Sequence, residues 1–256
     1  MKLSVVIIAK NAENDIADAI SSCAFADEII VIDNDSSDRT TQVAKRLNAE
    51  VFEVKTKDFS AIRNIGLKKA KEDWILYIDT DERVTSELAR NIKYQISSIR
   101  QAQDKNIKYQ NMGGYKIQRK NFYFGNHEWP HIEKMERLFK KDKLKGWSGE
   151  LHETPIFSGQ IEELDGFLLH YTHRDLSSMV KKTIEWSTIE AELRFKAGHP
   201  KITWWRFPRV MITAFFDSYI RQQGWKAGTI GIIESLYQSF SIFVTYAKLW
   251  ELQNKQ

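Results

Sequence analysis

Residues 74–82 have the sequence Trp74-Ile75-Leu76-Tyr77-Ile78-Asp79-Thr80-Asp81-Glu82, a short apolar run that leads directly into a cluster of carboxylates. An apolar run of this length, rich in Ile and aromatic residues, predicts a buried strand. Carboxylates at its end need a partner, because an unpaired charge is costly to remove from water. Mg²⁺ is one such partner, since it binds carboxylate and phosphate oxygens. The alternative is that Asp81 caps a helix beginning near Val84.

Strand and helix patterns alternate through the first third of the chain. Strands are predicted at Leu3–Ala9, Glu28–Asp33 and Glu50–Val54, and helices at Asn14–Cys23, around Val43–Leu47 and at Phe59–Lys71. With the strand that ends at residue 79, this alternation predicts an α/β fold with a parallel sheet and helices on both faces. Ligands bind at the carboxyl ends of strands in such sheets.

Length and composition set limits on the fold and the compartment. A chain of 256 residues allows one large domain, or one domain with an appendage, and 42% apolar residues suffice for a core. The single cysteine, Cys23, excludes an intramolecular disulfide and a cysteine-based metal cluster, and it favours a reducing cytosol. We expect no signal peptide, because the apolar run Met1–Ala9 is short and polar residues follow at once.

The net charge of +4 is unevenly distributed. Residues 171–256 carry 12 Lys and Arg against 7 Asp and Glu, and they contain five of the eight tryptophans. This composition favours peripheral contact of a cytoplasmic protein with the anionic inner face of the cytoplasmic membrane. No uncharged run reaches the roughly 18 residues of a membrane span. The candidates for contact are Trp204, Trp205, Arg206, Arg209 and the apolar stretch Val210–Phe216. The competing explanations are a solvated basic face, packing in the core, or a subunit interface.

The segment after the first strand decides between nucleotide-binding classes. Residues 10–14 contain no glycine, so both the dinucleotide-binding fingerprint and the Walker A loop are missing from the sequence there. Phosphates would then be held by a metal and by side chains. This points to Asp79 and Asp81, and to Arg63 at the start of the third predicted helix.

Several segments together resemble the family-2 inverting glycosyltransferases of GT-A fold, and they are similar to the subgroup that extends the lipopolysaccharide core of Gram-negative bacteria. The segments are Val5–Asn11, Asp27–Thr40, Arg63–Asn64, Tyr77–Glu82, Leu151–Glu153 and His173–Ser177, with a looser likeness at 215–224 and 246–249. The resemblance implies a Rossmann-like, mostly parallel sheet with flanking helices in a catalytic domain over residues 1–171. A helical region over residues 172–256 would serve the acceptor, a membrane or an oligomer.

The resemblance also implies roles on the donor side. Asp33 would contact the uracil of a UDP-sugar, and Arg63 would contact the base or the phosphates. Ala9 and Asn11 would border the nucleotide pocket. Residues 35–40 are Asp-Ser-Ser-Asp-Arg-Thr, whereas the family more often has Gly-Ser-Thr-Asp-Gly-Thr. The loss of both glycines stiffens the loop and keeps its acidic residue at position 38.

A metal site is implied next to the donor. Asp79 would face the ribose or the metal, and Asp81 would bind the Mg²⁺ or Mn²⁺ that bridges the diphosphate. The metal would stabilise the negative charge of the leaving UDP. His152 would reach the metal or position the acceptor.

The acceptor hydroxyl must lose a proton, so a carboxylate base is expected near the reacting sugar. Glu153 matches the family's His-Glu motif and is our preferred base, with Glu150 in reserve. The alternative is that both are surface carboxylates in a loop. On the same side, the turn-rich segment Gly125–His131 contains Trp129, which would either stack on a sugar ring or anchor the loop to the core.

Helices are predicted after residue 171. Leu176–Ala197 is a long helix that Gly198 and Pro200 stop, and a second helix accepts Pro208 in its first turn and ends at Gly224. A final amphipathic helix follows. One face carries Ile233, Leu236, Tyr237, Phe240, Val244 and Ala247, and the other carries Glu234, Gln238, Ser241, Thr245 and Lys248. The apolar face of such a helix ordinarily packs against the core.

The sequence therefore predicts an inverting, metal-dependent transferase that moves a hexose, with glucose as the expected sugar, from a UDP-sugar to a hydroxyl of a bacterial surface glycan such as lipopolysaccharide core. The acceptor would be a free or lipid-linked glycan, no nucleic acid is expected, and an oligomer is left open. A sugar-phosphate nucleotidyltransferase is the first rival, although it should have a glycine-rich phosphate loop. A non-catalytic scaffold of the same fold is the second, although it should have lost a carboxylate.

Overall fold

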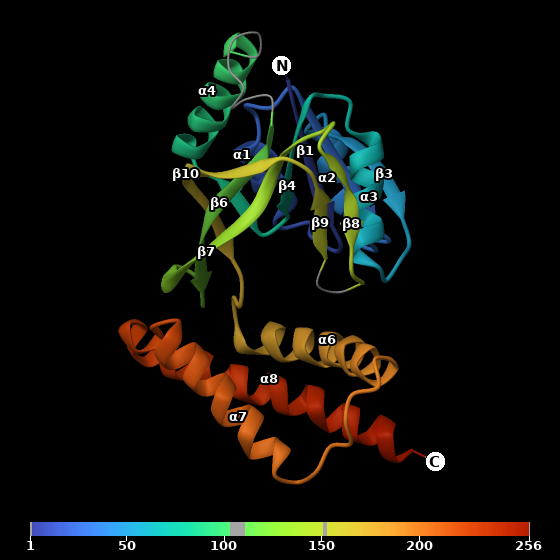
Figure 1. Cartoon of the computed structure of the whole chain (residues 1–256), viewed down its shortest axis with the longest axis vertical. Helices are drawn as coiled ribbons and strands as arrows, with labels where there is room; N and C mark the ends of the chain where they lie inside the picture. The colour runs from blue at the N-terminus through green and yellow to red at the C-terminus, as the bar shows by residue number, and fades with distance from the viewer. Residues whose placement is uncertain (1, 103–110, 151–152, 256) are drawn as a thin grey trace. The chain divides into compact units, whose positions relative to one another are not determined.

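The computed structural model describes residues 2–102, 111–150 and 153–255. They form two compact units, the first made of Met1–Lys120 and Glu133–His170 and the second of Asn121–Ile132 and Tyr171–Gln256 (Figure 1). The first unit contains the α/β sheet, and the second contains the long C-terminal helices. Asn121–Ile132 belongs to the helical unit, which the sequence pattern did not predict.

The N-terminal half of the first unit is the predicted α/β alternation. Its strands are β1 (Leu3–Ala9), β2 (Glu28–Asn34), β3 (Glu50–Val54) and β4 (Trp74–Asp79), and its helices are α1 (Ile16–Ser22), α2 (Thr40–Arg46) and α3 (Phe59–Lys69). The four strands pair in parallel in the order β3-β2-β1-β4. The predicted α/β class and the predicted strands are confirmed, with boundaries that differ by at most one residue.

The sheet continues with antiparallel strands. These elements are β5 (Glu82–Val84), α4 (Ser86–Ala102), β6 (Met112–Tyr123), β7 (His127–Lys140) and β10 (Gln160–Tyr171), with β8 (Leu144–Ser148) and β9 (Thr154–Phe157) in a separate two-stranded sheet. β7 pairs antiparallel with β4, and β5 pairs antiparallel with β10. Because residues 82–84 form a strand and α4 begins at Ser86, the alternative in which Asp81 caps a helix near Val84 is wrong.

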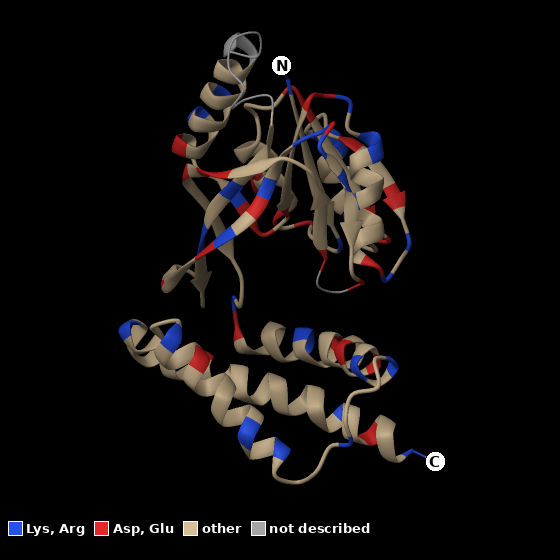
Figure 2. Cartoon of the chain, in the orientation of Figure 1, with Lys and Arg blue, Asp and Glu red and all other residues tan. Residues whose placement is uncertain are grey.

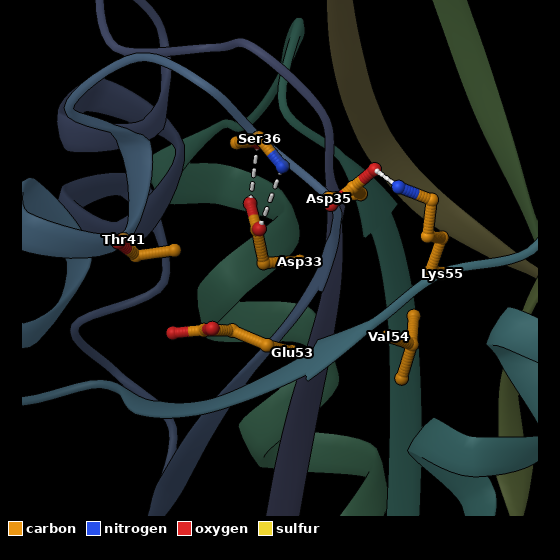
Figure 3. A pocket seen from close by; sticks show the side chains of 7 residues that line it. All are labelled: Asp33, Asp35, Ser36, Thr41, Glu53, Val54 and Lys55. Atoms are coloured by element: carbon orange, nitrogen blue, oxygen red, sulfur yellow. Dashed lines mark hydrogen bonds and ion pairs between the residues drawn. The ribbon is translucent and has the colours of Figure 1, made fainter.

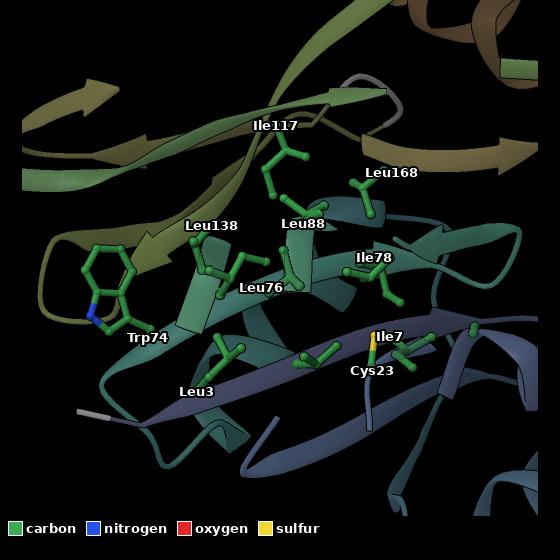
Figure 4. Packing of buried hydrophobic residues seen from close by; sticks show 14 of the residues in the cluster. Leu3, Ile7, Cys23, Trp74, Leu76, Ile78, Leu88, Ile117, Leu138 and Leu168 are labelled. Carbon is green, nitrogen blue, oxygen red and sulfur yellow. The ribbon is translucent and has the colours of Figure 1, made fainter. Parts of the chain in front are cut away.

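The central strands are buried on both faces, as expected for a sheet covered by helices. Side chains alternate between the two faces along each strand. In β4, Leu76 and Ile78 belong to one apolar cluster, together with Ile7 of β1 and Leu88 of α4 (Figure 4). Their neighbour Tyr77 belongs to the cluster on the opposite face, with residues of α3 and β8. The strands that lead to the carboxyl edge of the sheet are therefore packed on both faces.

The second unit contains three long helices. Its elements are α6 (Leu176–Lys196), α7 (Arg206–Phe216), the short turns η1 (Asp217–Arg221) and η2 (Gly224–Ala227), and α8 (Gly228–Asn254). The carboxylate of Asp175 caps α6 by accepting from the backbone N–H of Ser178, at 2.8 Å. Both α6 and α7 pack against α8. Among the described residues, no helix combines the length and the apolarity needed to cross a membrane.

The burial expected for the last helix from this pattern is wrong at Ile233, Leu236, Phe240, Glu234 and Thr245. Glu234 is only 1% exposed and Thr245 is buried, whereas Leu236 is 56% exposed and Phe240 is also exposed. The polar side is buried because it finds partners. Both carboxylate oxygens of Glu234 lie 3.0 Å from Nδ1 of His173. The apolar side of α8 is left facing solvent. Tyr237, predicted as buried, is buried, and its hydroxyl donates to the backbone oxygen of Met179 at 2.7 Å.

Trp129 anchors the tip between β6 and β7 within the second unit. The side chain is 1% exposed, and its Nε1 donates to Oε1 of Gln222 at 3.2 Å. A Cβ added at Gly224 would lie 2.7 Å from Cη2 of Trp129, so only glycine permits this packing. Of the two roles predicted for Trp129, the structure supports the anchor and leaves no exposed ring face for a sugar.

Candidate active site

Three of the predicted donor-side residues lie at one edge of the sheet. Ala9 is the last residue of β1 and is paired with Asp33 of β2, while Ile8 is paired with Asp79 of β4. Because these strands are parallel, their carboxyl ends meet at the same edge, where α/β folds bind ligands. The structure thus brings Ala9, Asp33 and Asp79 together as predicted.

A cavity of about 330 Å³ opens beside Asp33 (Figure 3). It is lined by Asp33, Asp35, Ser36, Thr41, Glu53, Val54 and Lys55. Asp33 is buried, and its carboxylate accepts from the backbone N–H of Ser36 at 3.0 Å and from its Oγ at 2.5 Å. The volume is in the range typical of small-ligand pockets.

Asn11 ties the loop after β1 to the loop after β2. Its backbone N–H donates to Oγ of Ser36, and its Oδ1 accepts from the backbone N–H of Ser37, both at 2.8 Å. Asn11 and Asp35 have φ angles of 48° and 59°, a region that Asn and Asp tolerate better than most residues. Asp35 therefore adopts the positive φ that a glycine would otherwise provide, and the loop keeps its shape without one.

An alternating network of charges links the predicted catalytic and donor-side residues. In order, it connects Glu153, Arg63, Asp79, Arg137, Glu82, Arg119 and Glu133. The nitrogen–oxygen distances from Glu153 to Arg119 are 2.6, 3.2, 2.9, 3.0 and 3.0 Å. Each buried charge in the network has a partner of opposite sign, as burial requires.

The guanidinium groups of Arg137 and Arg63 stabilise the charged form of Asp79. Burial by itself raises the pKa of Asp79, but Arg137 and Arg63 outweigh it and hold this pKa well below its usual range. Burial lowers the pKa of Arg137, and Glu82 and Asp79 more than restore it. Asp79 and Arg137 are therefore charged at neutral pH. Among the described residues, Nη1 of Arg63 and Nε of Arg137 are buried without a hydrogen-bond partner. These spare donors suit an anionic ligand.

Arg63 is fixed by aromatic rings as well as by charges. Its guanidinium carbon lies 5.0 Å from the ring centre of Trp147 and 5.7 Å from that of Tyr77, distances typical of cation–π contacts. Next to it, Asn64 donates to the backbone oxygen of Trp147 at 2.9 Å and accepts from its N–H at 2.8 Å. These contacts attach α3 to β8, the strand that leads to the predicted bases.

The two candidate bases have different surroundings. The carboxylate of Glu153 is mostly buried and accepts from Nε of Arg63, so it belongs to the network. The side chain of Glu150 is exposed, and its backbone oxygen accepts from the N–H of Phe59 at 3.0 Å. His152 lies outside the described residues.

Asp81 has a neighbour that the sequence analysis did not predict. Nε2 of His170, on β10, lies 3.2 Å from Oδ2 of Asp81. Within residues 2–102, 111–150 and 153–255, no group of three His, Cys, Asp or Glu side chains is arranged to hold a metal. A carboxylate and an imidazole that share the ion with phosphate oxygens nevertheless fit Mg²⁺ or Mn²⁺, which need few protein ligands when a substrate supplies the rest.

Two further site residues, Arg137 and His170, were not predicted, and only His170 had a signal in the sequence. His170 follows two leucines in the strand that ends at Tyr171, and a titratable residue inside an apolar strand needs a buried partner. Arg137 follows residues 133–136, which are mostly charged, so the sequence pattern did not indicate its burial. Only the fold identifies the partners of both residues.

Comparison with known proteins shows the class to which this α/β protein belongs, the glycosyltransferases of GT-A fold. The sequence matches the family described as Glycosyl transferase family 2 over residues 4–161, and the chain belongs to this family. The predicted resemblance, fold class and enzyme class are thereby confirmed.

The similarity to these relatives extends along almost the whole chain. An uncharacterized glycosyltransferase of Rickettsia typhi is 30% identical, and the match covers 99% of this chain and 88% of that protein. The lipopolysaccharide core biosynthesis glycosyltransferase LpsC of Rhizobium meliloti is 22% identical, with 98% and 93% covered. Among solved structures, this chain resembles the mannosyltransferase PcManGT of Pyrobaculum calidifontis in complex with GDP-Man and Mn²⁺, with a TM-score of 0.54 and 11% identity. The match covers 98% of this chain and 87% of PcManGT. That last likeness concerns the fold alone.

Proposed function

We propose that this glycosyltransferase is an inverting, metal-dependent enzyme that moves a hexose, with glucose as the expected sugar, from a UDP-sugar to a hydroxyl of a bacterial surface glycan such as lipopolysaccharide core. The observation that carries the proposal is the ion network in which Arg63 joins Glu153 to Asp79 at the carboxyl edge of the sheet. The groups proposed for the donor side and for the acceptor side are thus linked through one side chain. The relation to LpsC supports the class of acceptor.

On the donor side, the base of the nucleotide would occupy the cavity beside Asp33, with Ala9 and Asn11 at its border. The spare guanidinium donors of Arg63 and Arg137 would face the diphosphate. Charge-assisted contacts of this kind are strong and directional. Asp79 would keep both arginines in position and face the ribose.

Asp81 and His170 are the residues that would hold Mg²⁺ or Mn²⁺, with Asp79 and His152 as further candidates. When bound, the metal would act as a Lewis acid toward the leaving diphosphate. Both Asp79 oxygens already accept from arginines in this structure, which favours Asp81 as the principal carboxylate ligand. The complex of PcManGT with Mn²⁺ agrees with metal use in this fold.

On the acceptor side, a carboxylate oxygen of Glu153 would take the proton from the attacking hydroxyl, with Glu150 in reserve. The hydroxyl oxygen would form its bond to the anomeric carbon as the bond to UDP breaks. A single displacement of this kind inverts the configuration. The acceptor would be a free glycan or a lipid-linked one met at the inner face of the cytoplasmic membrane.

The test is a UDP-release assay with a panel of UDP-sugars and with purified lipopolysaccharide core as acceptor. We expect release with one UDP-hexose, loss of release in EDTA, and recovery with Mn²⁺ or Mg²⁺. Proton NMR of the product should show an inverted anomeric centre. Full activity in EDTA would exclude the metal assignment. GDP-mannose and a nucleoside triphosphate with a sugar 1-phosphate serve as comparison substrates, and pyrophosphate release from the latter would favour a nucleotidyltransferase.

A further inference from the structure

Helix α7 presents apolar side chains to solvent along its whole length. Every residue of α7 is at least partly exposed. Ile212 and Phe216 are among its most exposed apolar residues, and Ile220 continues the row one turn later. Directly before the helix, Trp204 is 82% exposed. An isolated exposed apolar residue needs no explanation, but a contiguous row of them indicates an interaction surface.

Helix α8 carries a second exposed row. Its exposed apolar members are Ile232, Ile233, Leu236, Phe240, Phe243 and Trp250. Ile232 and Ile233 are adjacent and the later members follow at spacings of three, four or seven residues, which places all of them on one side of the helix. The helix cannot turn this side inward, because Glu234, Tyr237 and Thr245 already use the other sides for buried contacts.

The two rows belong to neighbouring antiparallel helices. Near the start of α7, the backbone N–H of Ile202 donates to Oε1 of Gln253 close to the end of α8, at 2.9 Å. Past the end of α7, Oγ of Ser218 lies 3.0 Å from Oγ of Ser235. Between these points the rings of Phe207 and Phe243 are 5.6 Å apart.

Positive charge concentrates around the same helices (Figure 2). Residues 201–233 contain the basic residues Lys201, Arg206, Arg209, Arg221 and Lys226 and a single acidic residue, Asp217. This segment alone accounts for a charge of +4, equal to the net charge of the whole chain. The ring of Trp205 lies 5.6 Å from the guanidinium of Arg206 and 5.7 Å from that of Arg209.

We infer that the exposed apolar sides of α7 and α8, with the basic residues of 201–233, form a docking surface for a bilayer that contains anionic lipid. Apolar side chains would enter the acyl boundary, tryptophans would lie at the headgroup level, and Lys and Arg would contact lipid phosphates. The inference defines the membrane-facing residues of the proposed enzyme, and so it rests on the proposed lipid-linked acceptor.

A second copy of the chain fits this surface less well. In a two-fold dimer the same patch lies on both subunits, so the basic residues of one copy would face those of the other. The patch offers one carboxylate against five cations, and Asp217 already pairs with Arg221 at 2.9 Å. The surface is thus not complementary in charge to itself, whereas an anionic bilayer is complementary to it.

The experiment is sedimentation of the full chain with vesicles, in the presence of neither donor nor acceptor. One set of vesicles is phosphatidylcholine, and the other is phosphatidylcholine mixed with phosphatidylglycerol. The variants are Leu236→Glu/Phe240→Glu in the apolar row of α8 and Arg206→Glu/Arg209→Glu in the basic segment. Ile184→Glu is the matched control, because Ile184 is an equally exposed apolar residue on α6. Circular dichroism checks that each variant is folded.

We expect the wild type and Ile184→Glu to sediment with the anionic vesicles at low salt and to be released at high salt. Both double variants should bind at least about tenfold more weakly, since each basic residue near an anionic surface and each inserted apolar side chain contributes to binding. Wild-type protein that stays in the supernatant would overturn the inference. Equal binding to both kinds of vesicle would overturn its electrostatic part.

Light scattering tests whether a second copy of the chain, and not a bilayer, occupies this surface. A dimer in solution that Leu236→Glu/Phe240→Glu dissociates, together with failure to bind vesicles, would assign the surface to a second copy instead. UDP release with a water-soluble acceptor fragment is measured in parallel. It depends on the α/β site and not on this surface, so it reports separately on the proposed function.

Discussion

At the residue scale, Arg63 connects the two halves of the candidate site. One of its nitrogens donates to Glu153 and another to Asp79, while two aromatic rings fix the guanidinium plane. A resemblance to known enzymes assigns Arg63 to the base or the phosphates. The structure adds that the same side chain orients the preferred base.

The identity of the base can be tested with Glu153→Gln, which keeps size and hydrogen-bonding shape but cannot take a proton. We expect turnover to fall by about 10²–10⁴-fold, the usual effect of losing a general base. Glu150→Gln should stay near wild type, because the Glu150 side chain is exposed. UDP binding by calorimetry should survive in both. If Glu150→Gln is inactive and Glu153→Gln is active, Glu150 and not Glu153 is the general base.

The metal assignment predicts that Asp81 and His170 act together. Asp81→Ala and His170→Ala should each weaken Mn²⁺ binding in the presence of UDP by roughly tenfold or more. The readout is the electron paramagnetic resonance signal of free Mn²⁺ during a titration, which needs no turnover. His131→Ala is the control, because His131 is an exposed histidine of β7. Unchanged affinity in His170→Ala would remove His170 from the site.

At the scale of elements, α8 shows how partners decide which side of a helix is buried. Periodicity alone places its larger apolar residues inside. In the structure, α6 offers a hydroxyl and a backbone oxygen to Tyr237, and His173 offers a ring nitrogen to Glu234. Satisfied polar groups are compatible with burial, so the polar side faces inward.

Burial of the polar side of α8 leads to a stability prediction opposite to the one that the helical pattern would give. Glu234→Ala should lower the free energy of unfolding by about 2 kcal/mol, because a buried hydrogen-bonded charge is lost and His173 is left without it. Leu236→Ala should cost less than about 0.5 kcal/mol, because Leu236 is exposed. Urea denaturation of both variants decides between the two orientations. The opposite ranking would restore the orientation predicted from the pattern.

At the scale of the whole molecule, the chain has one thiol, and it lies deep in the sheet unit. Cys23 is fully buried within the cluster that also contains Ile7 and Ile78. Burial raises the pKa of the Cys23 thiol to about 12, so little thiolate forms even in alkaline buffer. Thiolate is the reactive form.

Cys23 therefore serves as a reporter of opening of the sheet unit. In native buffer at pH 9, an ordinary exposed thiol reacts readily with a disulfide reagent, and we expect Cys23 not to react on that timescale. In urea it should react completely. The rate of reaction as a function of urea, followed by release of the coloured thiolate, should match the unfolding rate seen by fluorescence. Rapid reaction in native buffer would show that α1 opens locally.

The elements that depend on local pattern could be predicted from the sequence. The parallel strands and most of the helices follow from alternation and turn residues, and the carboxylates at positions 33, 79 and 81 follow from where apolar strands end. These features depend on neighbours within a few residues, which the sequence displays directly.

The partners of the buried charged and polar groups, in contrast, depend on contacts between segments that are far apart in the sequence. Arg137 and His170 enter the site because β7 and β10, which are distant in sequence, come together beside Asp79 and Asp81. The buried side of α8 depends likewise on groups brought by α6 and by the segment after β10. The physical reason is the same in both cases: a buried charge or polar group is stable only beside a complementary group, and long-range folding determines which group that is.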